Sequence, residues 1–253
     1  MKTVQVRNVT IGEGRPKICV PIVGQTKEEI LAEAGSFAEL PIDVVEWRAD
    51  WYEDVFDTDK VLETAKELNT VLKDTPILFT FRTAKEGGEK SISNEDYQNL
   101  NLTVAKSGLV DLIDVEAFTG DEIVTNIISK AHDFNVKVVA SNHDFDKTPE
   151  KEELIRRLCK MQELDADIPK IAVMPTCRRD VLTLLDATLE MSESYAGRPI
   201  ITMSMAGTGV ISRLAGETFG SALTFGSATK ASAPGQIPVN ELKQVLDILH
   251  KSL

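Results

Sequence analysis

The sequence lacks any apolar run that approaches the ~20 residues required by a membrane-spanning helix. Its first seven residues, Met-Lys-Thr-Val-Gln-Val-Arg, do not contain the apolar core of a secretory signal. The three cysteines are widely separated and form no Cys-x-x-Cys pair, so neither a disulfide framework nor a zinc ribbon is supported. We therefore predict a cytoplasmic protein with no membrane partner.

Positive charge is also scarce, because 28 Lys and Arg residues stand against 40 Asp and Glu, for a net charge of -12. A general nucleic-acid surface needs clustered Lys and Arg, so no nucleic-acid partner is expected. An acidic protein can still bind a small anion if a few arginines gather in one pocket.

Apolar runs rich in Val, Ile and Phe alternate with amphipathic stretches of helical period, about every 30 residues. Such alternation is typical of parallel strands covered on both faces by helices. Helix starts are predicted at Thr26, Ser93, Thr148 and Asp180, whose side chains suit helix caps. The predicted strands are residues 18–23, 44–48, 77–82, 112–116, 136–142, 170–174, 200–205 and 223–226.

Eight such units predict a (β/α)8 barrel that forms a single domain over residues 1–253. The alternative is an open doubly wound sheet, whose dinucleotide-binding form requires Gly-x-Gly-x-x-Gly after the first strand. This chain has Val23-Gly24-Gln25-Thr26 there. We further predict that residues 1–16 form a hairpin that closes the barrel floor, and that residues 226–237 form a lid loop over the active site.

Lys170 is unusual because it lies inside the apolar segment 168–175, which reads as a buried strand. Burial lowers the pKa of a lysine, by roughly 3 to 5 units when it is complete, and yields a neutral nucleophilic amine. Such an amine condenses with carbonyl substrates to form a Schiff base. The alternative is a lysine that pairs with a carboxylate.

Polar residues at the carboxyl ends of barrel strands are candidates for chemistry. His143 ends the strand before the one that carries Lys170, and it is predicted to act as general acid and base, with Glu86 fixing its tautomer. A structural histidine that caps the following turn is the alternative. The histidines His132 and His250 are expected to have solvated or packing roles.

Arginines at the same strand ends are candidates for holding an anionic substrate. Arg213 follows a glycine-containing loop, and its guanidinium suits a carboxylate. Arg48 and Arg82 could instead pair with carboxylates of the protein. For Arg48 the candidate partner is Glu46, which lies close to it in sequence. A divalent metal site at the barrel mouth is a further alternative. Its candidate ligands are Glu46, Asp50, Asp114, Glu116 and His143.

Several segments, in order and at barrel spacing, resemble type I 3-dehydroquinate dehydratase, the shikimate-pathway lyase. They are Glu46-Trp47-Arg48-Ala49-Asp50, Phe79-Thr80-Phe81-Arg82, Glu86-Gly87-Gly88, Ser141-Asn142-His143-Asp144-Phe145, Ile168-Pro169-Lys170-Ile171-Ala172, Gly209-Val210-Ile211-Ser212-Arg213 and Ala231-Ser232-Ala233-Pro234-Gly235-Gln236.

The resemblance implies a homodimeric (β/α)8 barrel without a metal or organic cofactor. It implies that Lys170 forms an imine with 3-dehydroquinate and that His143, held by Glu86, carries protons. A class I aldolase or transaldolase, with Gly207-Thr208-Gly209 as a phosphate site, is the alternative function, and a non-catalytic barrel is a third possibility. The substrate contacts implied by the resemblance are Glu46, Arg48, Arg82, Arg213, Ser232 and Gln236.

Overall fold

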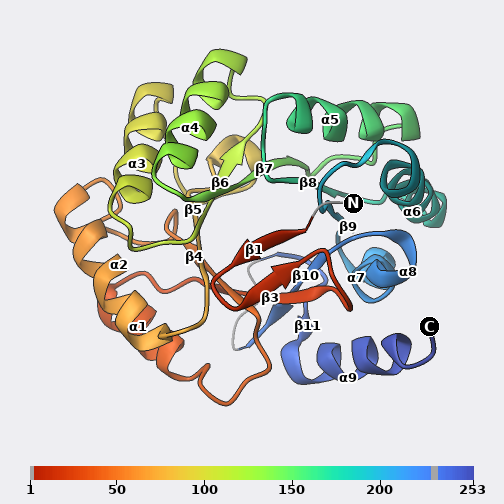
Figure 1. The fold of residues 1–253 in the computed structure, drawn as a ribbon, viewed down its shortest axis with the longest axis horizontal. Coiled ribbons are helices and arrows are strands. Elements are labelled where there is room, and N and C mark those ends of the chain that lie inside the picture. The colour runs from red at the N-terminus through yellow and green to blue at the C-terminus, as the bar shows by residue number, and fades with distance from the viewer. Residues whose placement is uncertain (1–2, 229–232) are drawn as a thin grey trace.

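The computed structural model describes residues 3–228 and 233–253. Helices surround a curled sheet of parallel strands (Figure 1). Each predicted strand is present, with its ends shifted by at most two residues. The strands are β3 (Lys17–Ile22), β4 (Val44–Arg48), β5 (Ile77–Thr80), β6 (Leu112–Glu116), β7 (Lys137–Asp144), β8 (Ile168–Val173), β9 (Ile201–Ser204) and β10 (Leu223–Ser227).

The ring of strands closes between β9 and β10. Neighbouring strands pair in chain order from β3 to β9, and β10 pairs with β3. Ile200 and Ser221 form a parallel bridge, and the backbone N–H of Ala222 donates to the carbonyl of Ile200 at 2.8 Å. At the carboxyl end, the short strand β11 (Ile237–Pro238) pairs with the free edge of β10. The predicted (β/α)8 barrel is therefore confirmed.

A hairpin closes the amino end of the barrel, as predicted. Strands β1 (Val4–Val6) and β2 (Val9–Ile11) pair antiparallel and cross the end nearest the viewer in Figure 1. Val4, Val6 and Ile11 are buried against the inward-facing residues of the strands, which together form the inner apolar cluster. A larger apolar cluster lies between the sheet and the helices. The floor of the barrel is thus filled with apolar side chains.

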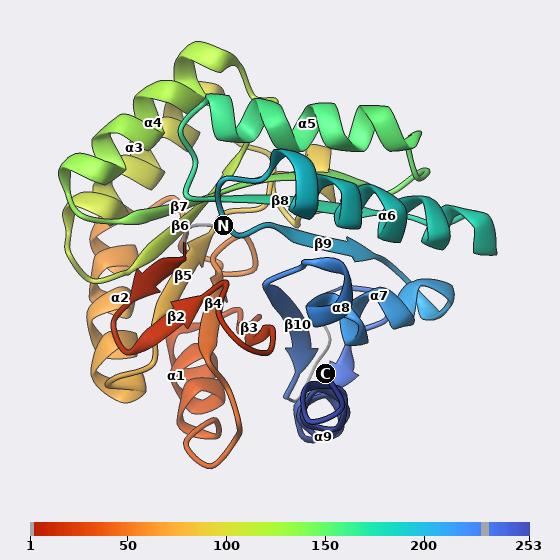
Figure 2. The same cartoon turned by 45° about the vertical axis from the view of Figure 1, so that its right-hand side comes forward.

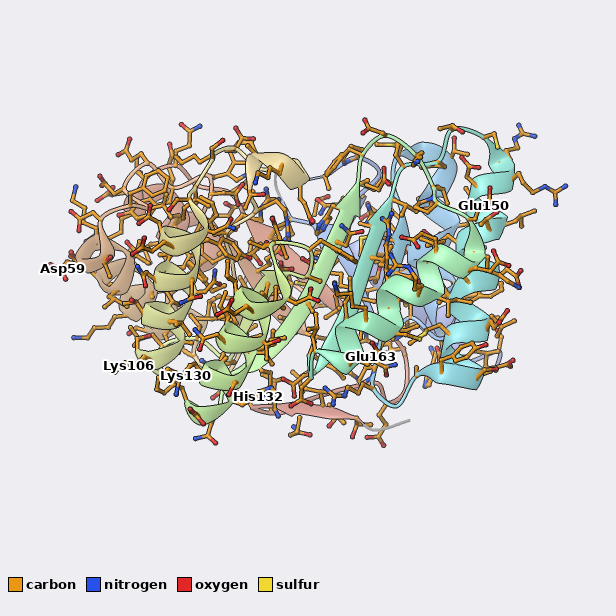
Figure 3. All side chains as sticks on the ribbon, turned by 90° about the horizontal axis from the view of Figure 1, so that it is seen from above. Asp59, Lys106, Lys130, His132, Glu150 and Glu163 are labelled. Atoms are coloured by element: carbon orange, nitrogen blue, oxygen red, sulfur yellow. The ribbon has the colours of Figure 1, made fainter. Side chains whose placement is uncertain are left out.

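The main helices return the chain from the mouth of the barrel to its floor. Figure 3 shows Lys106 and His132, at the ends of α3 and α4, on the same side as the hairpin. Figure 2 shows the same helices around the strands from a second direction. The helices are α1 (Lys27–Gly35), α2 (Thr58–Leu72), α3 (Asn94–Lys106), α4 (Asp121–Asp133), α5 (Lys151–Glu163), α6 (Arg178–Glu190), α7 (Val210–Leu214), α8 (Gly216–Phe219) and α9 (Val239–His250). In the described part of the chain, no helix has the length and apolar character needed to cross a membrane.

Two of the four predicted helix caps are confirmed. Thr26 accepts from the backbone N–H of Glu29, and Ser93 caps α3 in the same way. The other two predictions were wrong. Helix α5 begins at Lys151, and the Thr148 hydroxyl instead donates to the Met174 carbonyl. Asp180 is the third residue of α6, and its carboxylate accepts from the N–H groups of residues 176 and 177, before the helix begins.

Candidate active site

A cavity opens at the carboxyl ends of the strands, among the residues predicted to carry the chemistry. The space among its lining side chains measures about 510 Å³, including the open mouth. Ser232 lies outside the described residues, and the other eight predicted site residues all line the cavity. They are Glu46, Arg48, Arg82, Glu86, His143, Lys170, Arg213 and Gln236.

Lys170 projects from β8 into this cavity and is 3 % exposed. Its Nζ lies 3.3 Å from Oδ2 of Asp114 and 3.9 Å from Oε1 of Glu46. The ring of Phe225 lies on another side, with its centroid 4.6 Å from Nζ. The predicted burial is present, and so is the carboxylate pairing that was the alternative. The amine therefore sits at the cavity with an acid beside it.

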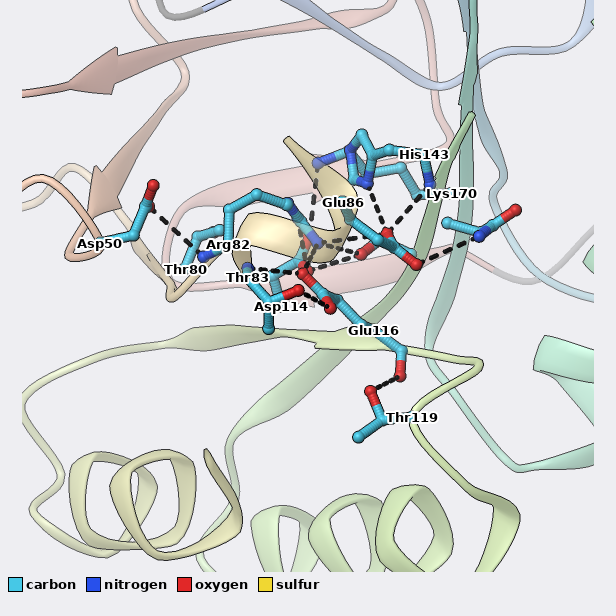
Figure 4. Close-up of polar contacts among 12 residues, drawn as sticks. Asp50, Thr80, Arg82, Thr83, Glu86, Asp114, Glu116, Thr119, His143 and Lys170 are labelled. Atoms are coloured by element: carbon cyan, nitrogen blue, oxygen red, sulfur yellow. Dashed lines mark hydrogen bonds and ion pairs between the residues drawn. The ribbon is translucent and has the colours of Figure 1, made fainter. Parts of the chain in front are cut away.

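Asp114 links Lys170 to Arg82 beneath the cavity (Figure 4). Its Oδ1 lies 2.7 Å from Nη2 of Arg82 and accepts from the Ser141 hydroxyl at 2.6 Å. Burial acts to raise the pKa of Asp114, but the positive charges of Arg82 and Lys170 outweigh it and hold that pKa below its usual value. Asp114 is thus an ionised carboxylate between two cations.

Glu86 is placed by a tight turn that follows β5. The turn is a single 3-10 helix, Ala84–Glu86, and it ends at Gly87, whose φ is +83°. A Cβ on Gly88 would lie 1.9 Å from the carbonyl oxygen of Arg82, so only glycine fits there. The turn directs Glu86 toward His143: Oε2 lies 3.0 Å from Nδ1 and accepts from the His143 backbone N–H at 3.0 Å.

Burial shifts both members of this pair toward their neutral forms. It raises the pKa of Glu86 to about 7, although the charge of Arg82 opposes the shift. Burial, together with the charges of Arg82 and Lys170, holds the pKa of His143 well below its usual value. His143 is therefore a neutral imidazole at neutral pH, which is the form that accepts a proton.

Arg213 is a buried cation without a carboxylate partner among the described residues. It is 1 % exposed, and its Nη2 donates to the Pro234 carbonyl at 3.1 Å. Burial lowers the pKa of Arg213 to about 10. Its Nε has no hydrogen-bond partner in the described part of the structure. A guanidinium left in this state at a cavity wall is suited to a small anion.

The other two arginines are already paired with protein carboxylates. Arg48 makes two hydrogen bonds of 2.8 Å to Asp50, and not to its predicted neighbour Glu46. Arg82 also contacts Glu116, at 3.1 Å. The carboxylates of the metal alternative therefore face arginines and Lys170, and no group of three potential ligands is found among the described His, Cys, Asp and Glu side chains.

The two histidines outside the cavity have structural contacts. His132 lies 2.8 Å from Asp167, and His250 lies 2.6 Å from Glu217.

A family model described as type I 3-dehydroquinase matches residues 18–253. The chain belongs to the type I 3-dehydroquinase family. The predicted family and its enzyme class, a lyase of the shikimate pathway, are thereby confirmed.

Close relatives in this family cover the chain from end to end. The 3-dehydroquinate dehydratase of Clostridioides difficile is 58% identical over 252 residues, which are 100% of this chain and 99% of the relative. That of Listeria monocytogenes serotype 4a is 62% identical over 251 residues, 99% of each chain. A crystal structure of the Clostridium difficile type I enzyme, with covalent modified comenic acid, has a TM-score of 0.98 and covers 100% of this chain and 99% of its own. The crystal structure of 3-dehydroquinate dehydratase from Geobacillus kaustophilus is 40% identical, with a TM-score of 0.96. The match covers 99% of this chain and 97% of the Geobacillus chain.

Sequence reasoning missed several residues of this 3-dehydroquinase site. Asp114, Glu116 and Asp50 appeared only as possible metal ligands, yet they are the partners of the buried cations. Asp114 and Glu116 lie in an apolar strand, which was the available signal, because a buried carboxylate needs a cation or donors nearby. The apolar part of the lining was also not predicted. It includes Phe145, Met203, Met205 and Phe225.

Proposed function

We propose that this chain dehydrates 3-dehydroquinate to 3-dehydroshikimate through an imine on Lys170, with His143 as general acid and base. One observation carries the proposal: a buried lysine, a neutral imidazole and an arginine without a carboxylate partner among the described residues all line the same cavity. These groups match the ketone, the C–H bond and the carboxylate of the substrate. Family membership supports the same substrate.

The first step forms the imine. The amine of Lys170 adds to the ketone carbon, and the carbonyl oxygen departs as water. Starting from the ammonium form, the two protons needed for that water both come from Lys170, so the product is an iminium and no net proton is consumed. His143 carries protons between the nitrogen and the departing oxygen. Asp114, whose Oδ2 lies 3.3 Å from Nζ, holds the Lys170 side chain beside the cavity.

The second step eliminates water from the iminium. The positive nitrogen withdraws electrons and acidifies the adjacent C–H, and neutral His143 takes that proton. The C–H electron pair forms the new double bond while the β-hydroxyl leaves. His143 returns its proton to the hydroxyl, which departs as water. A further water then hydrolyses the imine and releases the product and Lys170.

Arg213 is the proposed anchor for the substrate carboxylate. A bidentate guanidinium–carboxylate pair would supply the partner that Arg213 lacks among the described residues. Fixing the carboxylate also fixes which proton faces His143, and positioning of this kind is worth several kcal/mol. The comenic acid in the relative's structure is covalently modified, which supports a nucleophile in this cavity.

Several sequence-based predictions remain part of this proposal. They are the single domain, the lid at residues 226–237, the homodimer, the cytoplasmic location and the absence of a metal or organic cofactor. The substrate contacts of Glu46, Arg48, Arg82, Ser232 and Gln236 belong to it as well.

Borohydride trapping tests the imine. The chain is treated with 3-dehydroquinate and borohydride and then digested for mass spectrometry. We expect a reduced adduct on the peptide that contains Lys170, and none in Lys170→Ala. Lys137→Ala is the control, because Lys137 pairs with Asp167 at the start of β7 and does not line the cavity.

Turnover without a trapped adduct, or an adduct that survives in Lys170→Ala, would contradict the imine mechanism. The aldolase and transaldolase alternative is set aside because the 3-dehydroquinase family model covers residues 18–253.

A further inference from the structure

A row of hydrogen bonds leads from helix α5 to the imidazole of His143. Nη1 of Arg157, in α5, donates to Oδ1 of Asn142 at 2.8 Å. Nδ2 of Asn142 donates to Oε1 of Glu86 at 3.1 Å. Oε2 of Glu86 then faces Nδ1 of His143 at 3.0 Å. Arg157 does not line the substrate cavity, and this row of hydrogen bonds connects it to the site.

The chemistry of Arg157 fixes the direction of the first two bonds in the row. A guanidinium has only donors, so the amide of Asn142 must turn its oxygen toward Arg157 and its NH2 group toward Glu86. Oε1 of Glu86 is then an acceptor. Oε2 accepts from the backbone N–H of His143, so both oxygens face donors, which favour the ionised carboxylate. When Glu86 is ionised, the proton between Glu86 and His143 belongs to Nδ1.

We propose that Arg157 and Asn142 are positioning residues that set the tautomer of His143, with the proton on Nδ1 and a free lone pair on Nε2. The lone pair is what a general base needs to take the substrate proton. The inference rests on the proposed function, because it assigns the tautomer that His143 requires in that reaction.

The surroundings of Glu86 show why such a device matters. Arg82 lies 3.7 Å away and favours its charged form, whereas burial and the carboxylates of Asp114 and Glu116 oppose that form. With a pKa of about 7, Glu86 is close to gaining a proton at neutral pH. Without the positive charge of Arg157 behind Asn142, Glu86 takes up a proton from solvent more readily. A proton on Oε2 is donated to Nδ1, and the imidazole then carries its own proton on Nε2.

Arg157 itself is held in place by groups outside the cavity. Its Nε donates to Glu153 at 2.7 Å, Asp144 lies 3.9 Å from its Nη1, and its guanidinium lies 5.9 Å from the ring centroid of Phe118. The neighbouring Arg156 binds the same carboxylate of Glu153 and is 60 % exposed. Arg156 is therefore a matched control, since it shares the surface ion pair but makes no contact with Asn142.

The test compares Arg157→Met with Arg156→Met. Methionine keeps an apolar stem against Phe118 and has no donor. We expect the midpoint of the acidic limb of the kcat–pH profile to be about one pH unit higher in Arg157→Met than in the unmodified chain. At pH values below the midpoints of both proteins, kcat of the variant is then about tenfold lower, and at high pH the two kcat values are equal. KM and the borohydride adduct on Lys170 stay unchanged. Arg156→Met keeps the profile of the unmodified chain, and Arg157→Lys, which retains a charged donor, restores part of the shift.

Nitrogen NMR of histidine-labelled protein reads the tautomer directly. We expect His143 to carry its proton on Nδ1 in the unmodified chain and to populate both tautomers in Arg157→Met. An unchanged pH profile and tautomer in Arg157→Met, with dehydration and the Lys170 adduct intact in the unmodified chain, would overturn the inference. Failure of the proposed function is distinguishable, because the unmodified chain would then form no adduct.

Discussion

Nζ of Lys170 lies 3.3 Å from the carboxylate of Asp114, and both side chains are buried. The same carboxylate lies 2.7 Å from Arg82. One acid therefore pairs with two buried basic side chains. Its removal would leave two buried charges with fewer partners, which is among the most destabilising changes available in a protein interior.

Asp114→Asn is expected to lower the free energy of unfolding by about 3 to 5 kcal/mol, because it removes one partner of a buried ion pair. Urea denaturation measures the loss. The control is Asp133→Asn, which removes the exposed partner of Lys130 and should change stability by less than about 1 kcal/mol. Equal small losses in the two variants would show that Asp114 does not hold the cations together.

Glu86→Gln should make the fold more stable at high pH. The pKa of Glu86 is raised to about 7 in the folded chain, from 4.5, so its stabilising proton is fully present below pH 4.5 and is lost as the pH rises through 7. Glutamine does not titrate, so the free energy of unfolding of Glu86→Gln, relative to that of the unmodified chain, should rise by about 3 kcal/mol between pH 4.5 and pH 7.

Unfolding free energies measured between pH 4 and pH 9 check this prediction. Glu122→Gln, at an exposed position in the first turn of α4, is the control and should show no comparable trend. A difference between Glu86→Gln and the unmodified chain that stays constant with pH would contradict the expected shift.

Arg213→Gln is expected to raise KM by about ten- to a hundredfold, the cost of a charged hydrogen-bonded pair. Arg213→Lys keeps the charge but loses the planar guanidinium, so its KM should lie between that of the unmodified chain and that of Arg213→Gln. Steady-state kinetics at saturating and limiting substrate separate KM from kcat. If KM is unchanged in Arg213→Gln, Arg213 does not bind the carboxylate.

His143→Gln should lower kcat by about 10²- to 10⁴-fold, the usual contribution of a general acid–base group. The reduced adduct on Lys170 should still form on long incubation, because the amine and the carboxylate anchor remain. Single-turnover kinetics with borohydride trapping compare the two steps. Loss of the adduct in parallel with turnover would instead indicate a structural role for His143.

Gly88→Ala should displace the turn that carries Glu86, because its Cβ would lie 1.9 Å from the Arg82 carbonyl oxygen. We expect a loss of stability of about 1 to 3 kcal/mol, as for other overpacked sites, together with a lower kcat. Gly35→Ala, where nothing lies within 4 Å of the added Cβ, is the control. Equal behaviour of the two variants would show that the turn tolerates a side chain.

The barrel was predictable from the sequence because its strands are buried on both faces. Such strands read as apolar runs, and all eight were found within two residues of their observed ends. Side chains alternate between the two faces of a strand, and Glu46 with Arg48, and Lys170 with Ala172, accordingly line the cavity together. The position of the site followed from the architecture, since polar residues that end parallel strands meet at one mouth.

Individual polar pairings were not predictable. Lys170 and Asp114 are 56 residues apart, and alternation gives the side of a strand but not which oxygen meets which nitrogen. Asn142 is adjacent to His143 in sequence, yet its role depends on Arg157 from the following helix. Strand β11 was also missed, because its two residues give no periodic pattern.

The β1–β2 hairpin blocks the amino end of the barrel with apolar side chains. Because Val4, Val6 and Ile11 fill that end, substrate enters and product leaves by the same route, at the carboxyl ends of the described strands. Each molecule has to depart before the next one enters. The departure of the product therefore sets a ceiling on throughput, however fast the bond-breaking steps become.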